Sequence, residues 1–341
     1  MIEVLPLDAA GYRPHPLHAA DREWRETSCS VDFFVEGLHA LGCDPVPALA
    51  FTLGADFDGE QWRMLKIPPE DLRLLYGIAV DELNIWMPLT LHLCEHIGSG
   101  RMVTVDVDAW HLPDTAGVTY REVHQKTTIM AQMIDVSGRR LGYFHNAGYH
   151  ELHGDDYEAI VGPPNGADGW ELATMPPYTE AVRVDHLLRG SGSASALAHL
   201  AEPPVEAVVA LAASHVARRP FSNPIARMEK RITDDLDWLA CRELAVFHRY
   251  AFASLRQCGA GAELASSLIH WLAARGERDL EPVAEAMQTV SVVMKAAQFR
   301  LARSVARRAA LPALGLEPAA EAWQISTDLL ADRLGVAHAS S

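Results

Sequence analysis

The thiol of Cys29 is the strongest candidate nucleophile in the sequence. It lies in the stretch TSCSVDFF, where Thr27, Ser28 and Ser30 favour the start of a helix. Apolar residues then recur at helical spacing, which predicts a helix from about residue 30 to 41. The unpaired N–H groups and the dipole at a helix start favour a thiolate and can also hold an acyl oxyanion. The alternative is a small core residue, since free cysteines are usually buried and inert.

A cysteine nucleophile needs a histidine base and a group that orients the histidine. His124 opens the first strand of a hairpin predicted from about residue 124 to 152, with its turn at VSGRR. The returning strand would bring Asn146 and His150 opposite His124. Asn146 could accept a hydrogen bond from one imidazole nitrogen and leave the other for the thiol. The alternative is that His124 is a histidine at a strand end that faces water.

Other polar residues are weaker candidates. Asp106 and Asp108 alternate along a predicted strand and so share one of its faces. Paired carboxylates can bind a metal or a substrate amine, although they more often lie on a solvated face. The candidates for substrate or oxyanion binding are Gln61, Asp108, Asp114 and Lys126.

The segment HLCEH, residues 92–96, matches the inverted zinc-peptidase pattern H-x-x-E-H. His92 and His96 are spaced to share a zinc ion on one helix face, and Glu95 would be the base. The apolar residues of this segment form a separate stripe, so a solvated helix face explains the polar residues better. No third ligand is evident, and no metal is expected.

One basic stretch, KAAQFRLARSVARR at residues 295–308, lies near the C-terminus. No acidic residue occurs from 286 to 316, although the formal charge of the chain is −16. The stretch is either a solvated helix face or a surface that docks an acidic partner, such as a carrier protein, with the help of charge. The candidate docking residues are Lys295, Arg300, Arg303 and Arg307.

Composition excludes several classes of protein. The chain has 341 residues, of which 49% are apolar, enough for one large domain or two ordinary ones. The charge of −16 disfavours nucleic acid and anionic membranes as partners. No apolar run of about 18 residues, no secretory signal and no nucleotide-binding glycine motif is found. Five scattered cysteines without a C-x-x-C pair favour reduced thiols and a cytoplasmic location.

The elements that would position these residues divide into a mixed part and a helical part. Besides the hairpin, the first part is expected to hold strands at about 59–67, 101–112 and 178–187 and helices at about 68–78 and 87–100. After a flexible joint at 189–196, four to six helices are expected up to about residue 335. The organisation predicts an α+β domain with an antiparallel sheet over residues 1–190 and an all-helical domain over 196–335.

Four segments resemble a bacterial family known only as a domain of unknown function: RETSCSVDFFVEGLHALGCDP, DFDGEQWRMLKIPPEDLRLLYGI, VTVDVDAWHLPDTAG and HQKTTIMAQMIDVSGRRLGYFHNAGYHEL. The resemblance is close over residues 10–190 and loose over the helical part. The layout of that family is similar to that of the butirosin-pathway acyltransferase and of bacteriocin-processing cysteine peptidases, which share a papain-like fold. The resemblance implies a papain-like first domain in which Cys29, His124 and Asn146 form the triad.

The resemblance also implies a reaction. The butirosin-type enzyme moves an acyl group from the phosphopantetheine thioester of a carrier protein to an amine, and relatives of the present family occur beside amino-acid carrier-protein ligases. Acyl or aminoacyl transfer to an amine or other small acceptor is therefore implied, with a carrier protein as partner. No bound cofactor is expected, because the partner carries the phosphopantetheine.

The sequence departs from the peptidase pattern in two respects. No glutamine closely precedes Cys29, so Gln61 or the backbone N–H of Cys29 would have to hold the oxyanion. The spacing from His124 to Asn146 is longer than in the bacteriocin-processing enzymes, and Asp135 is a substitute for the third member. Two alternatives stay open: hydrolysis by the same residues, as a peptidase or amidase, and a non-catalytic protein that binds a carrier protein.

Overall fold

A computed structural model describes residues 1–162, 177–184, 201–309 and 313–336. Packing divides the chain into two compact units. The sheet unit comprises Met1–Ala19, Cys29–Pro45 and Leu72–Glu202, and the helical unit comprises Ala20–Ser28, Val46–Asp71 and Pro203–Ser341. Two early segments, 20–28 and 46–71, thus pack with the helices of the second half. The expected division into residues 1–190 and 196–335 does not include this exchange.

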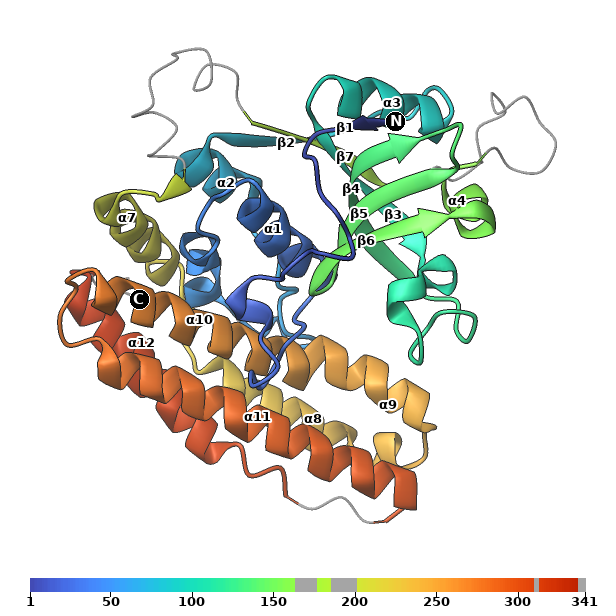
Figure 1. The fold of residues 1–341 in the computed structure, drawn as a ribbon. Coiled ribbons are helices and arrows are strands. Elements are labelled where there is room, and N and C mark those ends of the chain that lie inside the picture. Colours follow the sequence, from blue (N-terminus) through green and yellow to red (C-terminus); the bar gives the residue numbers. More distant parts are fainter. Residues whose placement is uncertain (163–176, 185–200, 310–312, 337–341) are drawn as a thin grey trace. The chain divides into compact units, whose positions relative to one another are not determined.

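The sheet unit is built on one antiparallel sheet (Figure 1). Its strands lie in the order β2-β7-β3-β4-β5-β6, and β1 pairs with β4. The strands are β1 (Ile2–Glu3), β2 (Ile78–Glu82), β3 (Met102–Asp108), β4 (Lys126–Asp135), β5 (Arg140–His145), β6 (Gly148–His153) and β7 (Thr179–Val184). The alternating and β-branched residues of β3 and β4 explain why these two strands lie near the middle of the sheet.

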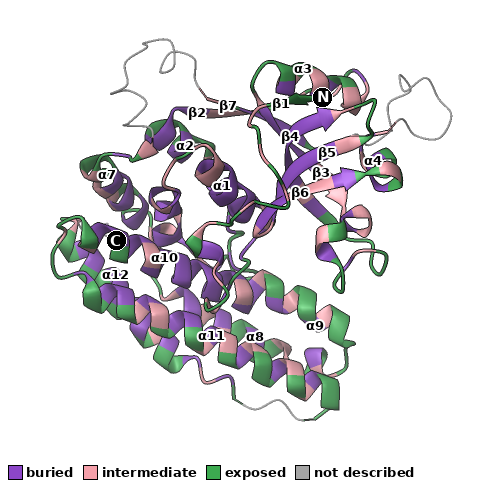
Figure 2. Cartoon of the chain, viewed as in Figure 1, coloured by how far each residue is buried: buried purple, intermediate pink, exposed green. Residues whose placement is uncertain are grey.

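Helices pack on both faces of this sheet. Those of the first part are α1 (Cys29–Ala40), α2 (Pro69–Tyr76), α3 (Leu89–Gly98) and α4 (Gly154–Ile160). Because side chains alternate along a strand, Ile129 and Ala131 of β4 share a core with α3 and α4. Met130 points to the other face, where it lies beside Gly37 of α1. Figure 2 shows the central strands and the inner sides of these helices as buried.

Most elements expected in the first part are present. The predicted helices at 30–41, 68–78 and 87–100 are α1, α2 and α3, and the predicted strands at 101–112 and 178–187 contain β3 and β7. The strand expected at 59–67 is wrong, because that segment makes only an isolated bridge between Phe57 and Trp62. The Trp62 N–H instead donates to the carbonyl of Ala253, 2.9 Å away, so a helical segment satisfies its backbone.

The predicted hairpin over 124–152 contains a third strand. A turn near VSGRR joins β4 to β5 as expected, and a second turn then joins β5 to β6. His145 pairs with Gly148 across this second turn, and Asn146 has a φ of 46°. Asparagine tolerates this left-handed conformation better than most residues, so Asn-Ala-Gly is a turn signal that the two-strand prediction missed.

The helical unit contains six α-helices among its described residues, within the four to six predicted. They are α7 (Val205–Val216), α8 (Pro224–Ala240), α9 (Leu244–Ala251), α10 (Gln257–Ala274), α11 (Glu281–Arg307) and α12 (Glu317–Arg333). A π-helical segment, Phe252–Arg256, links α9 to α10. α10 approaches Trp24 closely at Gly259, where an added Cβ would lie 2.6 Å from the indole ring.

The coarse architecture, an antiparallel sheet with helices followed by a helical region, agrees with the expected α+β class. The joint expected at 189–196 lies outside the described residues. Within the described ranges, no helix combines the length and the apolar character needed to cross a membrane.

Candidate active site

Cys29 is the first residue of α1, at the helix start that the sequence predicts. The residue is partly exposed and forms no disulfide. The first N–H groups of a helix have no intrahelical partner, so donors for a thiolate or an oxyanion lie close by. Cys258 shows the contrasting case, because it is fully buried and its burial raises the pKa of its thiol.

Two carboxylates share one face of α1 with Cys29. Residues three and four apart on a helix are neighbours, so Asp32 lies one turn from the thiol and Glu36 lies one turn further on. Asp32 and Glu36 are 1% and 0% exposed. Buried carboxylates need a partner, and His18 of the N-terminal segment provides it.

His18 is held between these two carboxylates. Its Nδ1 bonds to Glu36 Oε1, and its Nε2 lies 3.4 Å from Asp32 Oδ1. Burial alone would lower the pKa of His18, but the hydrogen bonds and charges of Asp32 and Glu36 raise it to about 9. Burial would raise the pKa of Glu36, whereas hydrogen bonds from His18 and Tyr12 hold it below its ordinary range. His18 is therefore a cation at neutral pH and is unsuited to act as a base.

Tyr12 and His15 complete the cluster around Glu36. Tyr12 Oη donates to Glu36 Oε2 at 2.7 Å, and the His15 N–H donates to Oε1 at 3.1 Å. Burial, and then the bond to Glu36, raises the pKa of Tyr12. This cluster was not predicted, although the spacing C-x-x-D-x-x-x-E places a thiol and two carboxylates on one helix face.

His124 has a carboxylate partner of its own. It lies just before β4, and its Nδ1 is 2.6 Å from Asp108 Oδ2 at the end of β3. Trp110 stacks on the imidazole, with the ring centroids 4.3 Å apart and the planes 9° from parallel. About 70% of the His124 side chain is exposed, and among the described residues nothing bonds to its Nε2. An imidazole held at Nδ1 and open at Nε2 is the arrangement that a general base needs.

Backbone hydrogen bonds hold the Asp108 carboxylate in place, independently of its contact with His124. Its Oδ1 accepts hydrogen bonds from the N–H groups of Trp110 (3.0 Å) and Gln125 (3.2 Å). Burial would raise the pKa of Asp108, but the bond from His124 and these backbone bonds lower it below its ordinary range. Asp108, expected to bind substrate or an oxyanion, thus makes the contact with His124 that was expected of Asn146.

Asn146 lies in the turn between β5 and β6, because the chain reverses there instead of continuing past His124. In the described part of the chain, no hydrogen bond joins Asn146 to His124, or either of them to Cys29. The substitute, Asp135, accepts from Ser137 and Gly138 in the turn after β4, as expected for a turn residue.

Both carboxylate oxygens of Asp114 bond to other side chains of the protein, which argues against its expected role with substrate. Its Oδ2 lies 2.6 Å from His145 Nδ1, and its Oδ1 accepts from Tyr143 Oη at 2.5 Å. His145 Nε2 lies 2.9 Å from Thr127 Oγ1, so the network ties β4 to β5. Burial would raise the pKa of Asp114, and the hydrogen bond and charge of His145 lower it by more. The side chains of Asp114 and His145 are 4% and 2% exposed, so substrate cannot reach them as they stand.

The remaining weak candidates, Lys126 and Gln61, make contacts of their own, although Lys126 is the cross-strand neighbour of Asp108. Lys126 is exposed and pairs with Asp106 at 3.0 Å across β3 and β4. Gln61 belongs to the helical unit, in a turn that its N–H closes by donating to Asp58 Oδ1 at 2.8 Å. Cys29 belongs to the sheet unit.

Only some residues of the segment 92–96, which matches the zinc-peptidase pattern, are exposed to solvent. Glu95 is exposed, but His92 is 3% exposed and accepts a hydrogen bond from the Trp86 N–H, so the solvated face expected for this segment is wrong at His92. Burial, and then the neighbouring His96, lowers the pKa of His92. Among the described residues, no group of three or more potential ligands is arranged to hold a metal ion.

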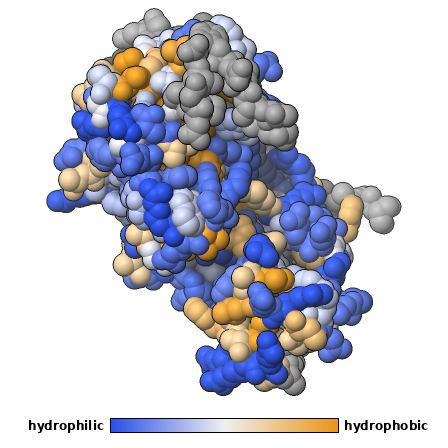
Figure 3. Space-filling view, turned by 90° about the vertical axis from the view of Figure 1, so that its right-hand side faces the viewer, coloured by the Kyte–Doolittle hydropathy of each residue, from blue (hydrophilic) through white to orange (hydrophobic). Residues whose placement is uncertain are grey.

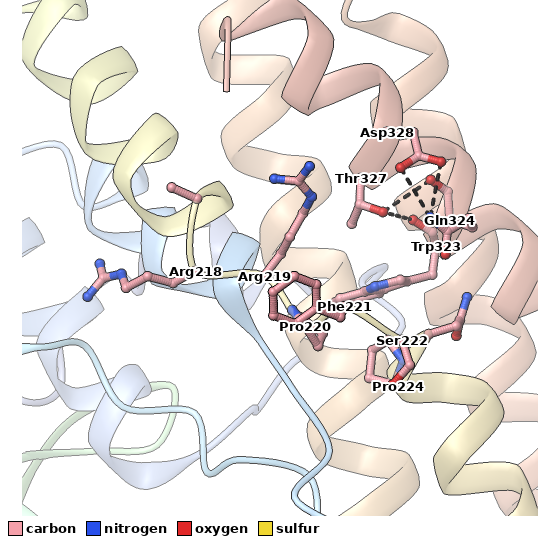
Figure 4. Close-up of a pocket in the computed structure, with 12 residues that line it drawn as sticks. Arg218, Arg219, Pro220, Phe221, Ser222, Pro224, Trp323, Gln324, Thr327 and Asp328 are labelled. Atoms are coloured by element: carbon pink, nitrogen blue, oxygen red, sulfur yellow. Dashed lines mark hydrogen bonds between the residues drawn. The ribbon is translucent and has the colours of Figure 1, made fainter. Parts of the chain in front are cut away.

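A cavity of about 250 Å³ lies in the helical unit, between the segment before α8 and α12 (Figure 4). One wall carries Arg219, Pro220 and Phe221, and α12 forms the opposite wall. There Gln324 Nε2 donates to both oxygens of Asp328, at 3.1 and 3.0 Å. The lining contains no nucleophile paired with a base, so this cavity is not a candidate catalytic centre.

The fold and this geometry define an α+β protein with a partly exposed helix-start cysteine and a separate His–Asp dyad. Residues 13–184 match the DUF1839 N-terminal domain, and residues 201–332 match the DUF1839 C-terminal domain. The chain belongs to the DUF1839 family. No curated protein matches it.

Proposed function

We propose that this protein transfers an acyl or aminoacyl group through a thioester on Cys29, within a papain-like fold. The observation that carries the proposal is the position of Cys29, a partly exposed residue that opens α1, the end of the helix toward which its backbone N–H groups point. The other partly exposed cysteine inside a helix, Cys94, has no such position, and burial raises the pKa of its thiol.

His124 is the base in this proposal, and Asp108 replaces Asn146 as the group that orients it. The thiol proton of Cys29 passes to His124 Nε2, and the thiolate attacks the carbonyl carbon of a carrier-protein thioester. The bond from carbon to the phosphopantetheine sulfur breaks, and the leaving thiolate takes the proton from His124. An acceptor amine then attacks the acyl-cysteine, His124 takes the amine proton, and this proton returns to the Cys29 sulfur as the amide leaves.

The exposure of His124 favours one competing outcome, hydrolysis. Water can reach an imidazole whose side chain is 70% exposed, and the same residues would then act as an amidase or peptidase. The acceptor that takes the acyl group separates these two functions. An amide formed from an added amine indicates transfer, and the free acid alone indicates hydrolysis.

Intact-mass analysis with an acylated carrier protein tests the proposal. Wild type is expected to gain the mass of the acyl group, Cys29→Ala to gain none, and Cys94→Ala to load like wild type. Loading that survives in Cys29→Ala would refute the assigned nucleophile. Absence of loading in wild type, with carrier protein still bound, would identify a non-catalytic binding protein instead.

A further inference from the structure

The helical unit has an exposed aromatic and basic surface. We call it the α11 patch, and it comprises the exposed Phe252, Val292, Phe299, Arg303 and Arg307, with the half-buried Arg256 and Lys295. Phe299 is 58% exposed, Val292 45% and Phe252 42%. Large apolar side chains that gather on a surface mark interaction sites more often than isolated ones do. Figure 3 faces the side on which α9 and the end of α11 lie in Figure 1, and its lower part shows hydrophobic side chains gathered among hydrophilic ones.

Contacts within the helical unit join these residues into one surface. The Arg256 guanidinium lies 5.6 Å from the centre of the Phe252 ring, and Lys295 Nζ lies 5.9 Å from that of Phe299. The π-helical segment packs against α11, and Arg256 donates to the Glu26 carbonyl at 2.8 Å while Lys295 donates to that of Glu23, so both cations hold the same short segment. The patch therefore continues from the π-helical segment onto α11.

Two of the predicted docking residues, Lys295 and Arg300, already donate to backbone carbonyl groups of the protein. Lys295 Nζ lies 4.0 Å from the centre of the Trp24 ring and donates to the Glu23 carbonyl at 2.6 Å, so it supports the patch from within. Arg300 donates to the Leu314 carbonyl at 2.6 Å and is partly committed to the loop after α11. Arg303 and Arg307 are exposed, and they follow Phe299 at intervals of four residues on the same helix face.

We infer that the α11 patch docks an acidic protein, whose carboxylates pair with Arg303 and Arg307 while an apolar side chain covers Phe299. Charge complementarity supports this occupant, because residues 286–316 contain no acid although the chain carries −16 overall. The same overall charge repels an extended polyanion or an anionic membrane, whereas a small acidic protein can engage the patch alone. The inference rests on the proposed function only in naming that protein as the carrier of the acyl donor.

Binding of a phosphopantetheinylated acyl carrier protein to the full-length Cys29→Ala variant tests the inference without chemistry. Charge reversal at Arg303 and Arg307 together is expected to weaken binding by about tenfold or more, and raised salt should weaken the unreversed binding in the same direction. Phe299→Ser is expected to weaken binding by about tenfold with less dependence on salt. Lys230→Glu is the matched control, since Lys230 is an exposed cation on α8, and it should stay within about twofold.

Equal binding by the Arg303/Arg307 reversal and by the Lys230 control would overturn the inference. So would a patch-dependent affinity for RNA or phosphatidylserine vesicles that exceeds the affinity for carrier protein. Patch-dependent binding by a protein whose Cys29 never loads would sustain the docking surface and reject the proposed reaction, so the two failures are distinguishable.

Discussion

The buried charge of His18 gives the most direct test of how α1 is held in place. Replacing His18 with Gln removes the cation that pairs with Asp32 and Glu36, whose residues are 1% and 0% exposed. Removing one member of a buried ion pair costs about 3–5 kcal/mol, because the remaining charge is uncompensated. We expect His18→Gln to lower the free energy of unfolding at pH 6.5 by about that amount.

The pH dependence has a defined sign. The pKa of His18 rises from 6.5 to about 9 on folding, so protonation stabilises the native state. That contribution is complete below about pH 6.5 and disappears as the pH rises towards 9. A shift of this size corresponds to about 3 kcal/mol, at about 1.4 kcal/mol for each pKa unit. The ring is buried, so solvent screens this interaction little.

Urea unfolding under reducing conditions at several pH values from 6 to 9.5 measures the effect. The stability difference between wild type and His18→Gln should shrink by about 3 kcal/mol across this range. His124→Gln is the matched control, because that imidazole is mostly exposed and its loss should change stability by less than about 1 kcal/mol. A second variant that combines His18→Gln with Glu36→Gln should recover part of the loss, since it removes the stranded charge.

A difference between wild type and His18→Gln that stays constant from pH 6 to 9.5 would refute the reasoning. It would mean that the ring is neutral in the native state and contributes by packing alone. A ring nitrogen NMR titration of His18 provides an independent measurement, in which the imidazolium signal should persist at pH 8.

Three further predictions concern the dyad, the second hairpin turn and the helical core. Asp108→Asn should slow acyl transfer about a hundredfold or more while the melting temperature stays near that of wild type, and equal rates would remove Asp108 from the mechanism. Asn146→Gly should preserve loading and stability because glycine accepts the left-handed turn, whereas a loss of loading as large as that of His124→Gln would restore Asn146 as the third triad member. Gly259→Ala should lower stability by about 1–3 kcal/mol in thermal unfolding, since the new Cβ would lie 2.6 Å from Trp24 and 2.9 Å from Met294, and an unchanged melting temperature would show that the helices can separate there at little cost.

Local signals in the sequence were sufficient for elements with strong periodicity and clear ends. The helix after Cys29 and the strand over β3 lie close to where apolar spacing predicted them. The segment at 59–67 alternates like a strand, but its partner is helical, and alternation alone does not reveal what a segment packs against. The place of Asn146 in a turn was not predicted, because the Asn-Ala-Gly signal between β5 and β6 was overlooked and one continuous returning strand was expected.

Some parts of the candidate site could likewise be predicted from neighbouring residues, and others depend on contacts between distant segments. The position of Cys29 follows from residues next to it in the sequence. The partner of His124 does not, because Asp108 reaches it through pairing of β3 with β4, and strand register decides which carboxylate meets the ring. His18 was missed for a related reason, since its carboxylates lie 14 and 18 residues away and are brought together only when the N-terminal segment packs on α1.

His18 and His124 differ in how many of their ring nitrogens are engaged. This difference distinguishes a structural histidine from a candidate base. His18 has both ring nitrogens engaged by buried carboxylates, which hold its proton to about pH 9, so it can fix α1 and the Cys29 thiol but cannot exchange protons near neutral pH. His124 has one carboxylate, on Nδ1, and keeps Nε2 open to solvent and substrate. A base must release and regain its proton in each turnover, so His18 is unsuited to the role that we propose for His124.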